Sequence, residues 1–131
     1  MKILNIYWAA LFVSAIFFLM YWFAPWAYGT LEPETQSMLS FGGTDSLVSI
    51  PEWWYWFHLV IVLVGYGGMF LLRKIFRWWF LGAFVLGLLL SPVYGTSIIT
   101  GIEVFIIDTS TFLSGFILAL AFFSPLKDKF Y

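Results

Sequence analysis

Four long apolar stretches dominate the pattern of hydrophobic and polar positions along the chain. They cover approximately residues 3–26, 53–72, 78–95 and 101–123. A helix needs roughly 20 apolar residues to cross the hydrocarbon core of a bilayer. The third stretch is the shortest, and the fourth reaches this length only if Glu103 and Asp108 lie inside the helix. The pattern predicts an all-α membrane protein: a single transmembrane domain over residues 1–131, built as a bundle of four transmembrane helices.

The composition excludes an ordinary soluble domain. Of the 131 residues, 63% are hydrophobic and 10% are charged, whereas soluble domains are about 45–50% apolar and about 25% charged. A soluble fold of this size leaves too much surface exposed to hide so many apolar side chains. The net charge of −1 argues against a nucleic-acid partner. The absence of cysteine excludes disulfides and thiolate metal sites.

The positions of the charged residues predict how the helices are oriented. Lysine and arginine occur only at the two termini and between the second and third stretches, and an excess of these residues marks cytoplasmic segments. The loop over residues 27–52, about 25 residues long, contains acidic residues and no basic one. We therefore expect both termini in the cytoplasm, this loop outside, and a location in a bacterial inner membrane. The basic residues are Lys2, Arg73, Lys74, Arg77, Lys127 and Lys129.

Local signals predict where some helices begin and end. Ser49 and Glu52 have the spacing of a capping box that opens the second helix, and Pro51 is tolerated in a first turn. Pro125 is expected to end the fourth helix because it cannot continue the hydrogen-bond ladder. Within the outer loop, residues 32–41 are the candidate for a short helix on the membrane surface.

Three ionisable side chains fall inside the predicted helices, where polar groups are costly and often functional. His58 lies in the second helix, and Glu103 and Asp108 lie within about two turns of the start of the fourth. The predicted topology puts all three in the outer part of the membrane. They form a candidate polar cluster for a proton relay or for cation binding.

The residues that share a helical face with Asp108 predict its direction. Thr111, Gly115 and Ala119 follow it at four-residue spacing, and small residues at this spacing let helices approach closely. We therefore expect this small-residue ridge to be a packing face and Asp108 to point into the bundle. Gly65, Gly67 and Gly68 on the second helix are candidate packing residues for the same reason, as are Gly82 and Gly87 on the third.

Glu103 lies about 140° around the helix from Asp108. It shares a stripe with Ser110 and Ser114, so we expect it to avoid lipid and to pair with His58 or to be protonated. Simpler roles exist for both acids. Glu103 would lie at the outer water interface, or Asp108 would cap a shorter fourth helix, since Asp is a favoured N-cap residue.

The chain contains no motif that we assign to catalysis, a cofactor or a metal. We therefore expect a small non-enzymatic membrane protein that acts through helix–helix or protein–protein contacts, as an accessory subunit, an assembly factor or an immunity-type protein. Its partners would be the lipid bilayer and another protein or further copies of itself. The alternative is an oligomeric proton- or ion-coupled transporter or channel component that uses His58, Glu103 and Asp108. A continuous polar cavity joining these three would favour transport, and carboxylates that only cap a helix would favour the first hypothesis.

Overall fold

The computed structural model describes residues 2–23, 51–94 and 99–131, and all regular structure within them is helical. Four of these helices are long and apolar enough to cross a membrane, which confirms the predicted helical class. The α-helices are α1 (Lys2–Trp22), α4 (Glu52–Phe70), α5 (Lys74–Leu90) and α6 (Gly101–Phe123). Two short 3₁₀ helices, η1 (Ser91–Tyr94) and η2 (Pro125–Lys129), follow α5 and α6.

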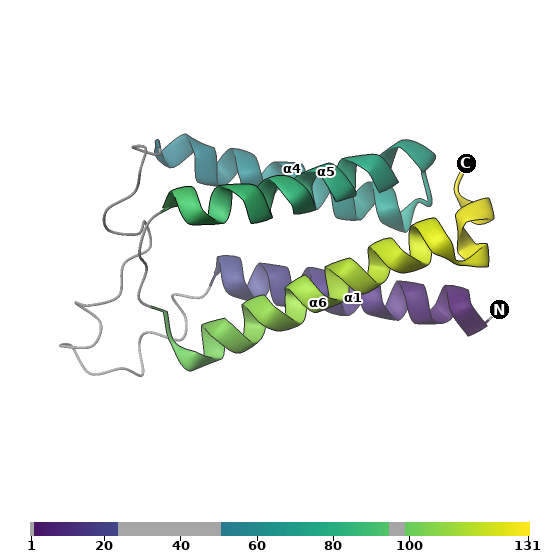
Figure 1. The fold of residues 1–131 in the computed structure, drawn as a ribbon, viewed down its shortest axis with the longest axis horizontal. Coiled ribbons are helices and arrows are strands. Elements are labelled where there is room, and N and C mark those ends of the chain that lie inside the picture. The colour runs from purple at the N-terminus through teal and green to yellow at the C-terminus, as the bar shows by residue number, and fades with distance from the viewer. Residues whose placement is uncertain (1, 24–50, 95–98) are drawn as a thin grey trace.

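The four α-helices alternate in direction and form an up-and-down bundle (Figure 1). The closest packing joins α1 to α6 and α4 to α5, so the bundle consists of two antiparallel helix pairs that face each other. Fewer residues meet between the two pairs. This uneven packing leaves space between the pairs, and the candidate site lies there.

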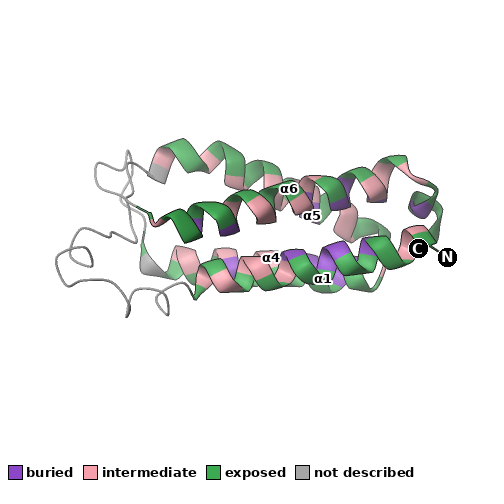
Figure 2. Cartoon of the chain, turned by 90° about the horizontal axis from the view of Figure 1, so that it is seen from below, coloured by how far each residue is buried: buried purple, intermediate pink, exposed green. Residues whose placement is uncertain are grey.

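The surface of the bundle is apolar along its whole length. Phe112 is 72% exposed, Leu89 is 69% exposed and Phe12 is 59% exposed, and Figure 2 shows exposed positions along every helix. Soluble monomers rarely expose large continuous apolar patches. The core is correspondingly narrow, and it is concentrated towards the end of the bundle that holds both chain termini.

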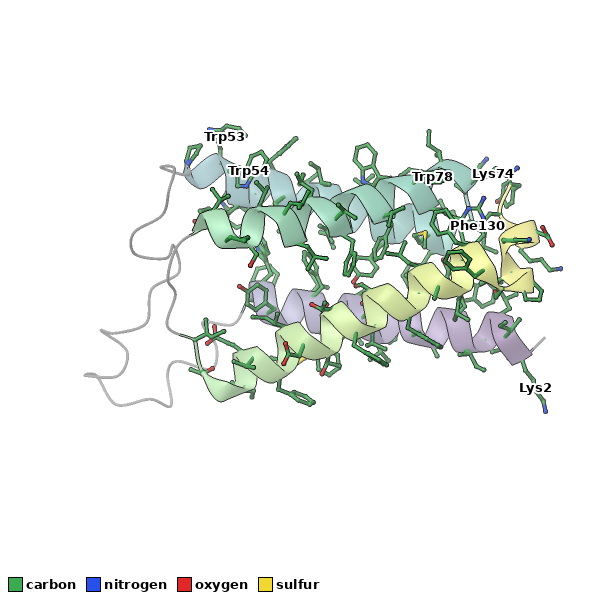
Figure 3. The ribbon with its side chains drawn as sticks, in the orientation of Figure 1. Lys2, Trp53, Trp54, Lys74, Trp78 and Phe130 are labelled. Atoms are coloured by element: carbon green, nitrogen blue, oxygen red, sulfur yellow. The ribbon has the colours of Figure 1, made fainter. Side chains whose placement is uncertain are left out.

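That end also carries every lysine and arginine, and we call it the basic end; the opposite end is the loop end. Figure 3 shows Lys2, Lys74 and Phe130 at the basic end and Trp53 and Trp54 at the loop end. The clustering of basic residues at one end agrees with the pattern read from the sequence.

The last residues of the chain are tied to the turn between α4 and α5. The Tyr131 N–H donates to the Leu72 carbonyl at 3.0 Å, and the Lys74 N–H donates to the Tyr131 carbonyl at 2.9 Å. Leu72 has a φ of 52° in this turn, a left-handed conformation that is uncommon for residues other than glycine. Phe130 is buried, and its ring meets Tyr7 edge-on at 6.0 Å between centroids.

Arg77 holds α5 and the carboxyl-terminal segment together at the same end. Its guanidinium donates to the carbonyls of Ala121, at 3.0 Å, and Lys127, at 3.4 Å. It also lies over the rings of Phe122 and Phe130, with centroid distances of 5.3 and 4.9 Å. A planar cation suits both kinds of contact, so an arginine inside α5 is stabilised by neighbouring carbonyls and rings.

The helix limits differ from the predicted ones mainly in α5. This helix begins at Lys74, one turn before residue 78, and so includes Arg77, which has partners within the bundle. Helix α4 has its N-cap at Pro51, whereas the predicted capping box needed Ser49, which lies outside the described residues. The predicted surface helix at residues 32–41 also lies outside them.

Candidate functional site

A cavity of about 260 Å³ lies between the two helix pairs. Side chains from all four α-helices line it, with Phe18 from α1 and Phe80 and Phe84 from α5 supplying large apolar walls. Its polar lining is His58, Tyr66, Ser91, Ser110, Thr111 and Ser114.

A hydrogen-bonded group of hydroxyls lies beside this cavity, and two of its members, Tyr66 and Ser114, line it. The Ser14 hydroxyl lies 2.7 Å from the Tyr66 hydroxyl and 3.4 Å from the Ser114 hydroxyl, and all three residues are buried. Each residue comes from a different helix, α1, α4 or α6, so the group joins the two helix pairs. Ser14 and Tyr66 were not predicted as functional or structural residues. The sequence signal that could have identified them is the position of each polar residue in the middle of an apolar stretch.

His58 lies in the part of the cavity nearer the loop end. Its ring is half-buried and stacks on Trp22 of α1, with an interplanar angle of 1° and 6.2 Å between centroids. The stacking partner fixes the imidazole at the wall of the cavity. This is the one residue of the predicted cluster that lines the cavity.

Glu103 is buried, with 3% of its surface exposed, and it closes a capping box at the start of α6. Its carboxylate accepts from the Thr100 N–H at 2.7 Å and from the Thr100 hydroxyl at 2.9 Å. The Glu103 N–H donates back to the Thr100 hydroxyl oxygen at 3.3 Å. The Thr–x–x–Glu spacing that predicts such a box was present in the sequence and was missed. The carboxylate therefore has a structural role.

Asp108 is exposed, so the expectation that it points into the bundle is wrong. The alternative role as the cap of a shorter helix is wrong as well, because α6 begins at Gly101 and Asp108 lies in its third turn. The buried face of α6 runs instead through residues such as Ile106 and Ile117, which pack towards α1 and lie on the opposite side of the helix.

The small-residue ridge that follows Asp108 also lies outside the packed core, although Thr111, at its edge, lines the cavity described above. Thr111 and Ala119 are exposed, and a Cβ atom added at Gly115 would meet nothing within 4 Å. The expectation that this ridge packs within the bundle therefore needs correction. Leu118, one residue away from the ridge, is buried in the core instead. Periodicity identified a face of small residues correctly but did not show which face meets the neighbouring helices.

Gly115 and Ala119 instead line an apolar groove of about 460 Å³ between α5 and α6, which we call the α5–α6 groove. At the basic end the groove is closed by Trp78 and Phe122, whose rings meet edge-on at 4.9 Å between centroids. The other lining residues are Leu81, Phe84, Val85, Leu118 and Phe123.

Two glycines of α4, Gly65 and Gly68, lie at close contacts with α5, whereas Gly67 and the glycines of α5 do not. A Cβ atom at Gly68 would lie 1.9 Å from the Phe76 ring, and one at Gly65 would lie 3.3 Å from the Trp79 ring. At Gly82 and Gly87 an added Cβ would meet nothing within 4 Å. Gly65 and Gly68 therefore leave room for the large rings of α5, and these contacts form part of the close α4–α5 packing.

The three ionisable residues of the predicted cluster thus have three different surroundings: a cavity wall, a helix cap and an outer face. Within the described part of the chain, no group of three His, Asp or Glu residues could hold a metal ion. Comparison with known proteins adds no relative: no family model matches the chain, and no curated protein and no solved structure matches it.

Proposed function

We propose that this chain is a multi-pass membrane protein without enzymatic activity that acts by contact with other membrane proteins, as an accessory subunit, an assembly factor or an immunity-type protein. The observation that supports this best is the separation of the two membrane-level carboxylates from the cavity. Glu103 closes a helix cap and Asp108 lies on an exposed face. A relay would need them to share a site with His58.

The apolar surface of the helices supports insertion into a bilayer, and the basic end supports one orientation. By the positive-inside rule, that end faces the cytoplasm, in a bacterial inner membrane on our proposal. Both termini and the α4–α5 turn would then be inside, and residues 27–52 outside.

Cysteine labelling in intact cells tests this orientation, because the chain has no native cysteine. Ser46→Cys should react with a membrane-impermeant maleimide, and Lys74→Cys and Lys129→Cys should react only after the membrane is permeabilised. Labelling of Lys129→Cys but not Ser46→Cys in intact cells would reverse the topology.

Photo-crosslinking in living cells tests the proposed mode of action. A photoreactive amino acid is placed at one exposed position on each helix: Ala9, Val64, Val85 and Ala119. We expect adducts of defined mass from one face and none from the others. If no position gives an adduct at native expression levels, action through contact is wrong.

A second candidate function is a component of an oligomeric proton- or ion-coupled transporter, and the cavity lined by His58, Tyr66 and three serines supports it. Reconstitution in vesicles with an internal pH-sensitive dye tests this proposal. Proton flux that His58→Phe abolishes while the helical content is unchanged would favour transport over the scaffold function.

A further inference from the structure

Asp108 and the α5–α6 groove lie on one continuous outer face of the bundle. Gly115 and Ala119 follow Asp108 by about two and three turns on the same side of α6, and both line the groove. Towards the basic end this face is apolar and concave. Towards the loop end it carries the exposed carboxylate of Asp108, which makes no hydrogen bond or ion pair with the described residues.

Lipid acyl chains are a poor environment for this face, because Asp108 places a carboxyl group on it. Helix α6 has 23 residues, which corresponds to ~35 Å, and Asp108 lies ~10 Å from its first residue. With a hydrocarbon core of ~30 Å, the proposed insertion puts this carboxyl group inside the apolar layer. The long stems of Lys and Arg let their charged ends reach the interface from inside the apolar layer. An aspartate side chain is too short to do so. Acyl chains offer neither a donor nor a positive charge, so the carboxyl group needs a protein partner.

A second copy of this chain lacks the complementary charge at the required depth. All six Lys and Arg residues lie at the basic end, which is far along α6 from Asp108. A copy inserted in the same orientation would bring the same carboxylate to this level and no Lys or Arg. Charge complementarity therefore favours a different protein.

We propose that the α5–α6 groove receives one transmembrane helix of another protein, and that this helix carries a basic residue at the level of Asp108. The exposed small side chains of α6 let the backbone of the incoming helix approach closely. The apolar groove then takes its side chains, and the ion pair with Asp108 sets its register and selects the partner. This inference rests on the proposed function and specifies the chemistry of the contact.

The probe is a set of synthetic single-span helices of about 20 Leu and Ala residues, added to the purified chain in phosphatidylcholine vesicles. The helices differ only at one position at the level of Asp108, which is Lys, Leu or Glu. Energy transfer between a dye on the peptide and a dye at Lys2→Cys measures binding. We expect the order Lys, then Leu, then Glu.

Two variants of the chain test the two parts of the contact. Asp108→Asn should weaken binding of the Lys helix roughly three- to tenfold, the scale of a single polar contact between helices, and Asp108→Lys should transfer the preference to the Glu helix. Ala119→Trp should fill the groove and abolish binding. Ala9→Trp, at an alanine of α1 that is also exposed, should leave binding unchanged. Circular dichroism confirms that each variant is folded.

The inference is wrong if the three peptides bind equally, if Asp108→Lys does not reverse the preference, or if Ala9→Trp weakens binding as much as Ala119→Trp. It is also wrong if energy transfer between two labelled copies shows self-association that Asp108→Asn removes. If the groove does not bind the peptides but photo-crosslinks form from another face, this inference fails and the proposed function stands. Absence of crosslinks from every face removes the proposed function itself.

Discussion

The hydroxyl groups of Ser14, Tyr66 and Ser114 are the clearest case in which single residues join the two helix pairs. The Tyr66 hydroxyl lies 2.7 Å from that of Ser14 in a buried position. A buried polar group left without a partner costs more free energy than the hydrogen bond contributes when formed. We infer that this group sets the relative position of α1, α4 and α6 near the middle of the bundle.

Tyr66→Phe tests this role because it removes one oxygen atom and preserves the ring. We expect the free energy of unfolding to fall by about 0.5–1.5 kcal/mol, the usual range for one hydrogen bond. Tyr21→Phe is the matched control, since Tyr21 is exposed. Thermal unfolding in mild detergent, followed by circular dichroism, measures both. Equal melting temperatures for the two variants would show that the hydroxyl group does not stabilise the fold.

At the scale of elements, the contact between α4 and α5 depends on where glycine stands. Gly68 leaves room for the Phe76 ring, whereas Gly67 faces open space. Gly68→Ala should therefore push Phe76 out of place and cost about 1–3 kcal/mol, as overpacking does. Gly67→Ala should be neutral or slightly stabilising, because alanine has the higher helix propensity. Thermal melts of the pair in one detergent compare them, and a larger loss at Gly67 would contradict the packing described.

The packing face of α6 gives a second prediction at this scale. Leu118 is buried and Gly115 faces the α5–α6 groove. Leu118→Ala should lower the free energy of unfolding by about 2–5 kcal/mol, as for other buried leucines, and Gly115→Leu should change it little. This order is the reverse of what the small-residue ridge alone suggests. A greater loss of stability in Gly115→Leu would mean that the ridge packs against another helix after all.

At the scale of the whole molecule, Arg77 and the carboxyl-terminal residues close the basic end of the bundle. Arg77→Met removes the donors to Ala121 and Lys127, so we expect faster release of the last residues by carboxypeptidase. Lys127→Met removes a charge at the same end but keeps the carbonyl that accepts from Arg77. Mass spectrometry of timed digests should show rapid trimming in the first variant only. Identical trimming of the two would show that Arg77 does not hold the segment.

The helical class and the number of candidate spans followed from the sequence alone. A run of about 20 apolar residues has few stable conformations in lipid other than a helix, because every backbone polar group must be bonded internally. The grouping of Lys and Arg at one end followed from the sequence too, since it needs only the number of spans. The start of α6 was predictable in principle from the spacing of Thr100 and Glu103.

Only the tertiary structure decided which face of each helix meets its neighbours. In a soluble protein the apolar face of a helix marks the core, but these helices are apolar all round, so hydropathy does not distinguish the buried side from the lipid side. Small residues indicate close packing, and Gly68 and Gly115 have the same signal with opposite surroundings. Neither periodicity nor composition showed that Glu103 turns inwards to a cap while Asp108 turns outwards. Their directions depend on how α6 is rotated against α1, and contacts between residues about 100 positions apart, such as Ser14 with Ser114, set that rotation.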